Sequence, residues 1–165
     1  MNVMKNMTII LIIGILVASC SSTVAVKQKV VITGKYSWEN WKVASEWKNF
    51  DAEQFVADEF LVSEISELSK VNNIKYLLFA GSWCGDSESE VPKIMKLIDK
   101  ATLNDKIEIW GLDRDKKEPN NTQLPYSILK VPTLIILKNS QEIGRIIEFP
   151  KSSWDIDLYE ILIKS

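Results

Sequence analysis

The sequence predicts an α/β fold in which a central mixed β-sheet is flanked by helices and preceded by an N-terminal extension. An apolar run from Tyr76 to Ala80 stops at Gly81, and apolar residues at helical spacing follow from Val91 onward. This pattern is typical of a buried strand that leads directly into a helix. A further apolar run, 134–137, is followed by a polar turn and by 143–149, which is predicted to return as an antiparallel strand and so to form a terminal hairpin.

Length and composition limit the possible functions. The chain has 165 residues, a net charge of −2 and no histidine. It therefore has room for one domain with short appendages. It also lacks the basic surface that would indicate a nucleic-acid partner. Without histidine, and with only two cysteines, the common zinc sites cannot form. We therefore expect no metal, no cofactor and no nucleic-acid partner.

Residues 1–19 have the features of a signal peptide, which is removed from the mature protein. Lys5 precedes an apolar segment, Thr8–Val17, that is shorter than the ~20 residues of a membrane-spanning helix. The segment ends in Val-Ala-Ser-Cys, which resembles the lipobox of bacterial lipoproteins. This resemblance implies that the mature chain begins at Cys20 and is lipid-anchored in the cell envelope. It would lie outside the cytoplasm, at the outer membrane or the periplasmic face if the cell has two membranes. An ordinary secretory signal is the alternative.

Residues 20–50 are expected to form a tether and a tryptophan-rich extension ahead of a domain at 51–165. Within them, 29–33 is predicted to be an edge strand. The extension contains Trp38, Trp41 and Trp47, which we expect to pack on the domain. A partner-binding aromatic surface is the alternative.

The domain is predicted to begin with a helix that Asp51 caps, with Gln54 at the reciprocal capping position. This helix should end near 71–73. Its apolar face is expected to consist of Phe55, Phe60, Leu61, Ile65 and Leu68.

After the central strand and helix, 106–112 alternates and predicts a second core strand, and 124–130 predicts a short helix or turn. Ser152 is expected to cap the last helix. Its inward residues are predicted to be Trp154, Leu158, Ile161 and Leu162.

Cys84 is the candidate reactive group because it stands at the predicted strand-to-helix junction. The free N–H groups and the dipole of a helix N-terminus stabilise an anion, so we expect this thiol to ionise readily. With Cys20 consumed by lipid, Cys84 would be the only thiol of the mature protein, and no internal disulfide could form. A buried structural cysteine is the alternative.

Four motifs, in order and at suitable spacing, resemble the thioredoxin family. Trp83-Cys84-Gly85 matches the start of that family's active motif, and Pro92 matches the proline that kinks the active-site helix. Val131-Pro132-Thr133 matches the loop whose proline is cis and faces the nucleophilic sulfur. Lys138-Asn139 matches the terminal hairpin. The resemblance covers about 74–163 and implies a thioredoxin-like fold, with Val131 and Pro132 shaping a groove for a substrate backbone.

The motif also departs from that family. Ser87 stands where the family has its second, resolving cysteine, Asp86 where it has a proline, and Leu78 where it has a buried acid. Ser87 cannot release a mixed disulfide as a second thiol does. The resemblance therefore implies a monothiol exchange through Cys84, with protein or small-molecule thiols and disulfides as partners and an external thiol as the resolving group.

Two neighbours of the thiol are expected to act in opposite directions. The hydroxyl of Ser87 should donate a hydrogen bond to the thiolate. The charge of Asp86 should disfavour the thiolate unless its side chain points to solvent. The alternative function is a redox-inactive binding module that has kept the fold.

Overall fold

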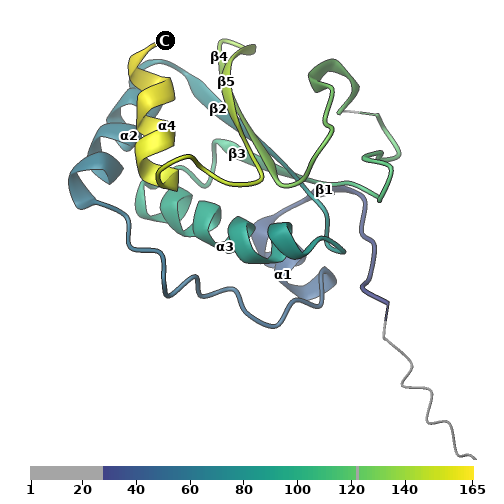
Figure 1. Cartoon of the computed structure of the whole chain (residues 1–165). Coiled ribbons are helices and arrows are strands. Elements are labelled where there is room, and N and C mark those ends of the chain that lie inside the picture. The colour runs from purple at the N-terminus through teal and green to yellow at the C-terminus, as the bar shows by residue number, and fades with distance from the viewer. Residues whose placement is uncertain (1–27, 122) are drawn as a thin grey trace, which may run out of the picture.

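The computed structural model describes residues 28–121 and 123–165, so the predictions for the signal peptide and Cys20 lie outside the described residues. The elements, in chain order (Figure 1), are β1 (Gly34–Tyr36), α1 (Trp38–Ala44), α2 (Glu59–Val71), β2 (Ile74–Ala80), α3 (Gly85–Lys100), β3 (Ile107–Gly111), the 3₁₀ helix η1 (Leu124–Tyr126), β4 (Thr133–Lys138), β5 (Gln141–Ile147) and α4 (Trp154–Ile163). Within the described part of the chain, no helix combines the length and the apolar character that crossing a bilayer requires.

The strands form one mixed sheet in the order β1-β3-β2-β4-β5. Strand β2 lies at its centre, parallel to β3 and antiparallel to β4. The hairpin of β4 and β5 and the edge pair of β1 and β3 are also antiparallel. The predicted α/β fold with a mixed central sheet is confirmed.

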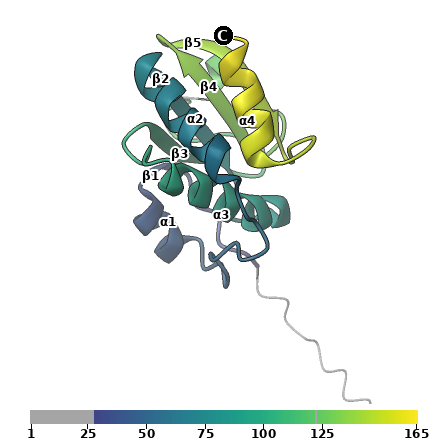
Figure 2. The same cartoon turned by 90° about the vertical axis from the view of Figure 1, so that its left-hand side faces the viewer.

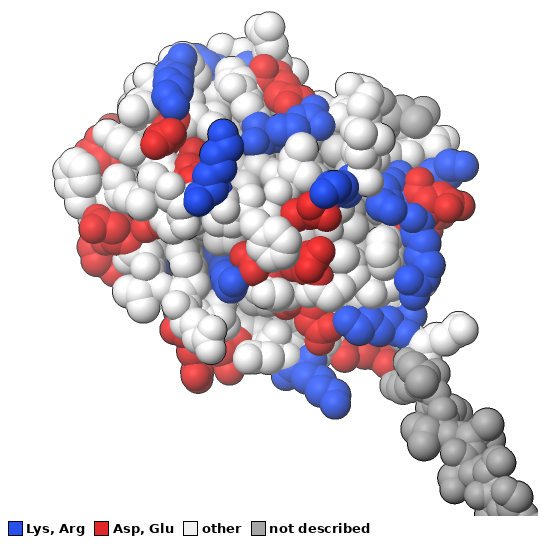
Figure 3. Space-filling view, in the orientation of Figure 1, with Lys and Arg blue, Asp and Glu red and all other residues white. Residues whose placement is uncertain are grey.

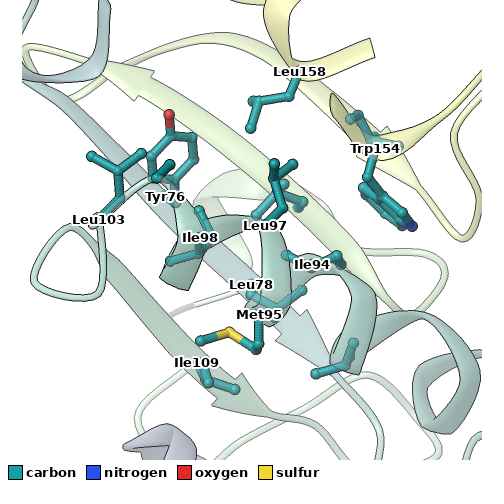
Figure 4. Close-up of a cluster of buried hydrophobic side chains, with 14 of the residues drawn as sticks. Tyr76, Leu78, Ile94, Met95, Leu97, Ile98, Leu103, Ile109, Trp154 and Leu158 are labelled. Carbon is teal, nitrogen blue, oxygen red and sulfur yellow. The ribbon is translucent and has the colours of Figure 1, made fainter. Parts of the chain in front are cut away.

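The two faces of the sheet are covered differently. Tyr76 and Leu78 of β2 point to the face on which α2, α3 and α4 pack, and they form the main core with residues such as Ile94 and Trp154 (Figure 4). Figure 2 shows α2 and α4 side by side over this face. Leu77 and Phe79 point to the other face, where residues of the irregular segment between β3 and β4, including Ile128, cover them. That segment lies on the opposite side of the sheet from the long helices (Figure 1).

The tryptophan-rich extension packs on the domain, as predicted. Trp41 is fully buried and Trp47 is 6% exposed. Their ring centroids are 5.4 Å apart in an edge-to-face arrangement. Trp38 is half-buried and makes a similar contact with Phe50 at 5.6 Å. The aromatic side chains therefore supply core to a segment that contains only a short strand and a short helix.

Two predicted boundaries near the N-terminus are wrong. The edge strand is not 29–33 but Gly34–Tyr36, because a buried serine, Ser82, hydrogen-bonds the backbone of Val30 and Ile32. The first long helix begins at Glu59 rather than after Asp51.

The cap of that helix is Asp58, whose carboxylate accepts from the N–H groups of Phe60 and Leu61 at 2.9 and 3.1 Å. Asp51 and Gln54 lie in the preceding loop, so the predicted capping box does not form. Phe60 is 65% exposed, in contrast to its predicted place on the apolar face.

The last helix begins one residue later than predicted. Ser153, not Ser152, is its N-cap, and the Ser153 hydroxyl accepts from the N–H of Ile156. Trp154, Leu158 and Leu162 are buried, as predicted from the helical spacing.

Candidate functional site

Cys84 is the N-cap residue of α3 and is half-buried. Its Sγ donates to the carbonyl oxygen of Val131 at 3.3 Å, across 47 residues of sequence. The Val131–Pro132 peptide bond is cis, and both residues are buried. The structure thus brings together three of the residues that the sequence singled out, and it places the half-buried Cys84 beside a cis-proline loop.

The turn from β2 into α3 fixes the position of the sulfur. The N–H of Cys84 donates to the carbonyl of Gly81 at 2.9 Å, and its own carbonyl accepts from the N–H of Glu88 at 3.1 Å, within the first turn of α3. Asp86 and Glu88 are the acidic residues of that turn, and acidic side chains there interact favourably with the helix dipole. Gly85 is exposed and has open space where a side chain would project.

Ser87 is fully buried, and its hydroxyl oxygen accepts a hydrogen bond from the N–H of Gly81 at 3.1 Å. Ser87 therefore ties the first turn of α3 back to the end of β2. No hydrogen bond joins Ser87 to Cys84 among the described residues. Because a hydroxyl can accept and donate at once, the predicted donation to a Cys84 thiolate stays a prediction.

Trp83 lies between the turn and the loop that follows β3. Its indole Nε1 donates to the carbonyl of Leu112 at 2.9 Å. A Cβ added at Gly81 would stand 2.8 Å from the Trp83 ring, so Gly81 is small because the indole needs the space. On the ring lie two cations, with the Arg114 guanidinium carbon 5.0 Å and the Lys116 Nζ 5.3 Å from the ring centroid.

The half-buried Asp86 is accompanied by a cation. The Nζ of Lys130 lies 2.6 Å from the carboxylate of Glu148. The hydrogen bond to Glu148 and the charge of Glu148, with a smaller contribution from Asp86, raise the pKa of Lys130. A small charge interaction therefore links Lys130 to Asp86.

Ser82 is a residue of this site that the sequence did not reveal. It is fully buried, and its hydroxyl donates to the carbonyl of Val30 at 2.6 Å and accepts from the N–H of Ile32 at 3.0 Å. Its carbonyl accepts from Nε1 of Trp47 at 2.7 Å. The N-terminal extension therefore holds the residue two positions before Cys84. A serine beside a glycine reads as an ordinary turn residue, and nothing local signals these partners.

Comparisons with known proteins identify the family of the chain. A family model described as "Thioredoxin" matches residues 37–160. The thioredoxin of Staphylococcus aureus is 32% identical over 98 residues, which are 58% of this chain and 86% of that protein. Two solved structures are also similar. Mitochondrial thioredoxin 3 of Saccharomyces cerevisiae, in its oxidised form, has 27% identity and a TM-score of 0.36 over 52% of this chain and 76% of that one. Fasciola hepatica thioredoxin has 21% identity and a TM-score of 0.40 over 60% and 91%. The family model spans most of the chain, and the chain therefore belongs to the thioredoxin family.

Proposed function

We propose that the protein is a lipid-anchored thiol–disulfide oxidoreductase of the cell envelope that works through one thiol, Cys84. The observation that carries the proposal is the position of this sulfur. It is partly accessible at the start of α3, and it lies 3.3 Å from the carbonyl of Val131, next to the cis Pro132. Membership of the thioredoxin family supports this class of reaction.

The proposed reaction is an exchange with balanced electrons. The Cys84 thiolate attacks one sulfur of a partner disulfide, the S–S bond breaks, and the leaving sulfur takes the bonding electron pair and a proton. The product is a mixed disulfide on Cys84. An external thiolate then attacks the partner's sulfur in that bond and releases Cys84 as a thiolate. The external thiol is required because Ser87 has no sulfur with which to resolve the intermediate.

The cis-proline loop supplies the docking edge in this proposal. A partner chain that approaches Cys84 in an extended conformation would pass beside Val131 and Pro132, where main-chain hydrogen bonds can hold it as an added strand. The loop would then align a partner disulfide with the sulfur.

Trapping of mixed disulfides tests the redox part of the proposal. The protein is purified from its native envelope without reductant, after free thiols have been blocked, and run on non-reducing gels. We expect adducts that reductant removes and that are missing from Cys84→Ser. If wild-type protein and Cys84→Ser give the same adduct-free band, thiol exchange is contradicted and the redox-inactive binding module takes its place.

Lipid attachment is tested separately. The Val-Ala-Ser-Cys motif supports attachment at Cys20, so cells fed labelled palmitate should label the wild-type protein and Cys84→Ser, but not Cys20→Ser. Equal labelling of Cys20→Ser would rule out this anchor, and no labelling of wild type would rule out lipid attachment altogether.

A further inference from the structure

We infer that Arg114 and Lys116 select anionic partners for Cys84, namely disulfides whose groups next to the sulfur carry carboxylates. This inference rests on the proposed function, and it assigns a substrate class to the same site. It stands on the placement of two cations beside the reactive motif and on the observation that neither forms an ion pair within residues 28–121 and 123–165.

The placement of the two cations is fixed by the loop after β3. The carboxylate of Asp113 accepts from the N–H groups of Asp115 and Lys117 at 2.9 and 2.8 Å, which closes the loop into a tight turn. The hydrogen bond from Trp83 to Leu112 joins the start of that loop to the motif. Arg114 and Lys116 therefore lie on the indole of the residue that directly precedes Cys84.

The two cations share their loop with acidic residues, Asp113 and Asp115, but no ion pair fixes either cation to a carboxylate among the described residues. Among the residues that the structure describes, neither Arg114 nor Lys116 forms an ion pair with a carboxylate, and the Nζ of Lys116 donates to the backbone carbonyl of Arg114 at 2.8 Å. Two other cations near the motif are by contrast ion-paired, Lys130 with Glu148 and Lys29 with Glu88. On the right of the view in Figure 3, over the loop that follows β3, basic side chains lie together with acidic ones.

Two cations at this position should make the reaction rate of Cys84 depend on the charge of the disulfide. A thiolate repels an anionic disulfide, and Asp86 adds to that repulsion. Arg114 and Lys116 lie over the ring of Trp83, the residue next to Cys84, and their positive charge should attract anionic reactants and stabilise them beside the motif. A cationic disulfide is attracted by the thiolate and by Asp86 and is repelled by Arg114 and Lys116. Because the loop is exposed, the effect should weaken as salt is added.

A series of small disulfides with the same core tests this. The probes are 3,3′-dithiodipropionate (anionic), bis(2-hydroxyethyl) disulfide (neutral) and cystamine (cationic). The full chain is used with Cys20→Ser, so that Cys84 is its only thiol, and mass spectrometry gives the rate constant of mixed-disulfide formation. In each reaction Cys84 is oxidised to the mixed disulfide, and the second half of the probe leaves as its thiol.

The measured quantity is the ratio of the anionic to the neutral rate constant, divided by the same ratio for a free cysteine peptide. At low ionic strength we expect this normalised ratio to be about 5 or more for the wild-type sequence. In the double variant Arg114→Gln/Lys116→Gln, and on addition of salt, it should fall most of the way to 1. The charge-preserving Arg114→Lys/Lys116→Arg should retain it. Lys117→Gln, which removes one charge from the same loop away from the indole, is the matched control and should also retain it.

The possible failures are distinguishable. If Cys84 reacts faster than the free peptide with the neutral disulfide but shows no charge preference, the substrate class is overturned and the proposed function stands. An equal fall in Lys117→Gln overturns the assignment to Arg114 and Lys116, since any loop charge would then do. If no probe reacts faster with Cys84 than with the free peptide, the proposed function fails and the inference fails with it.

Discussion

Cys84 and Ser87 stand three residues apart at the start of α3, and only one of them is a thiol. Ser87 nevertheless has a defined structural part, since its buried hydroxyl accepts from the N–H of Gly81. A sulfur at position 87 would stand three residues after Cys84, and residues three apart lie on the same side of a helix. A cysteine at position 87 would differ from Ser87 by one side-chain atom, with sulfur in place of oxygen.

Ser87→Cys should consequently create a dithiol that reduces protein disulfides, measured as the turbidity of insulin when its chains separate in the presence of dithiothreitol. The matched control is Ser89→Cys, which adds a thiol to the same helix at an exposed position. Equal activity of the two variants would contradict the idea that position 87 is the resolving position.

The side chain of Trp83 leaves no room for a side chain at Gly81. A methyl group at Gly81 would stand 2.8 Å from the indole, so Gly81→Ala must displace the ring or the turn, at a cost of about 1–3 kcal/mol in the free energy of unfolding. Gly85→Ala meets open space and serves as the control, with a change within about 0.5 kcal/mol. Urea unfolding measures both, and equal losses would contradict the steric argument.

The single residues that the sequence revealed are those with a local signal. Cys84 follows a strand and precedes a helical pattern, and Pro132 lies in a motif that resembles the thioredoxin family. Ser82 and Arg114 have no such signal, because their partners lie 52 and 31 positions away along the chain. Contacts of this kind appear only once the fold brings the segments together.

Helices and strands show the same division. Strand β2 and helix α3 were predictable because a short apolar run and a long helical pattern differ clearly in period. The start of α2 was not predictable, because Asp51 and Asp58 both precede apolar residues and either could be the N-cap. The choice is made by a distant group, since the carboxylate of Asp155 in α4 accepts from the N–H of Asp58 at 2.8 Å.

Asp155 thus joins the N-termini of α2 and α4. Burial alone would raise its pKa, but hydrogen bonds from Ser153 and from the N–H of Asp58 outweigh this and hold the pKa below the ordinary value of 3.8. A folded-state pKa that is lowered contributes stability at pH above the ordinary value, and the contribution is lost as pH falls through the lowered value.

Asp155→Asn should therefore lower the free energy of unfolding by about 1 kcal/mol at pH 7, and the difference from wild type should shrink below pH 4. Glu160→Gln on the exposed side of the same helix is the control, with little change at either pH. A difference between Asp155→Asn and wild type that is the same at pH 3 and pH 7 would contradict this role. Chemical denaturation at the two pH values measures it.

The N-terminal extension is the other element that depends on long-range contacts. Ser82→Ala removes the partner of a buried N–H and of a carbonyl in the extension, and it should cost about 1–3 kcal/mol. Ser89→Ala, at an exposed position of α3, should change stability by no more than about 0.5 kcal/mol. Hydrogen exchange should show faster exchange at Ile32 in Ser82→Ala. Unchanged protection there would mean that the serine does not hold the extension.

At the scale of the whole molecule, several separate segments of the described chain position Cys84 and its two preceding residues. The extension holds Ser82, the loop after β3 holds Trp83, the helix begins at Cys84, and the loop before β4 supplies Val131. Four segments that are distant in sequence thus fix one atom at the surface. Such an arrangement fits a residue that must be reached by a partner in one orientation.

The rate at which Cys84 reacts with iodoacetamide at pH 7 tests this account most directly. The full chain carrying Cys20→Ser is compared with the same chain unfolded in urea, so that Cys84 is the only thiol in both samples and a free peptide calibrates the effect of urea. The account predicts that the folded protein reacts roughly tenfold faster, because the free N–H groups and the dipole at the start of α3 stabilise negative charge on the attacking sulfur. A folded rate equal to or below the unfolded rate would contradict it.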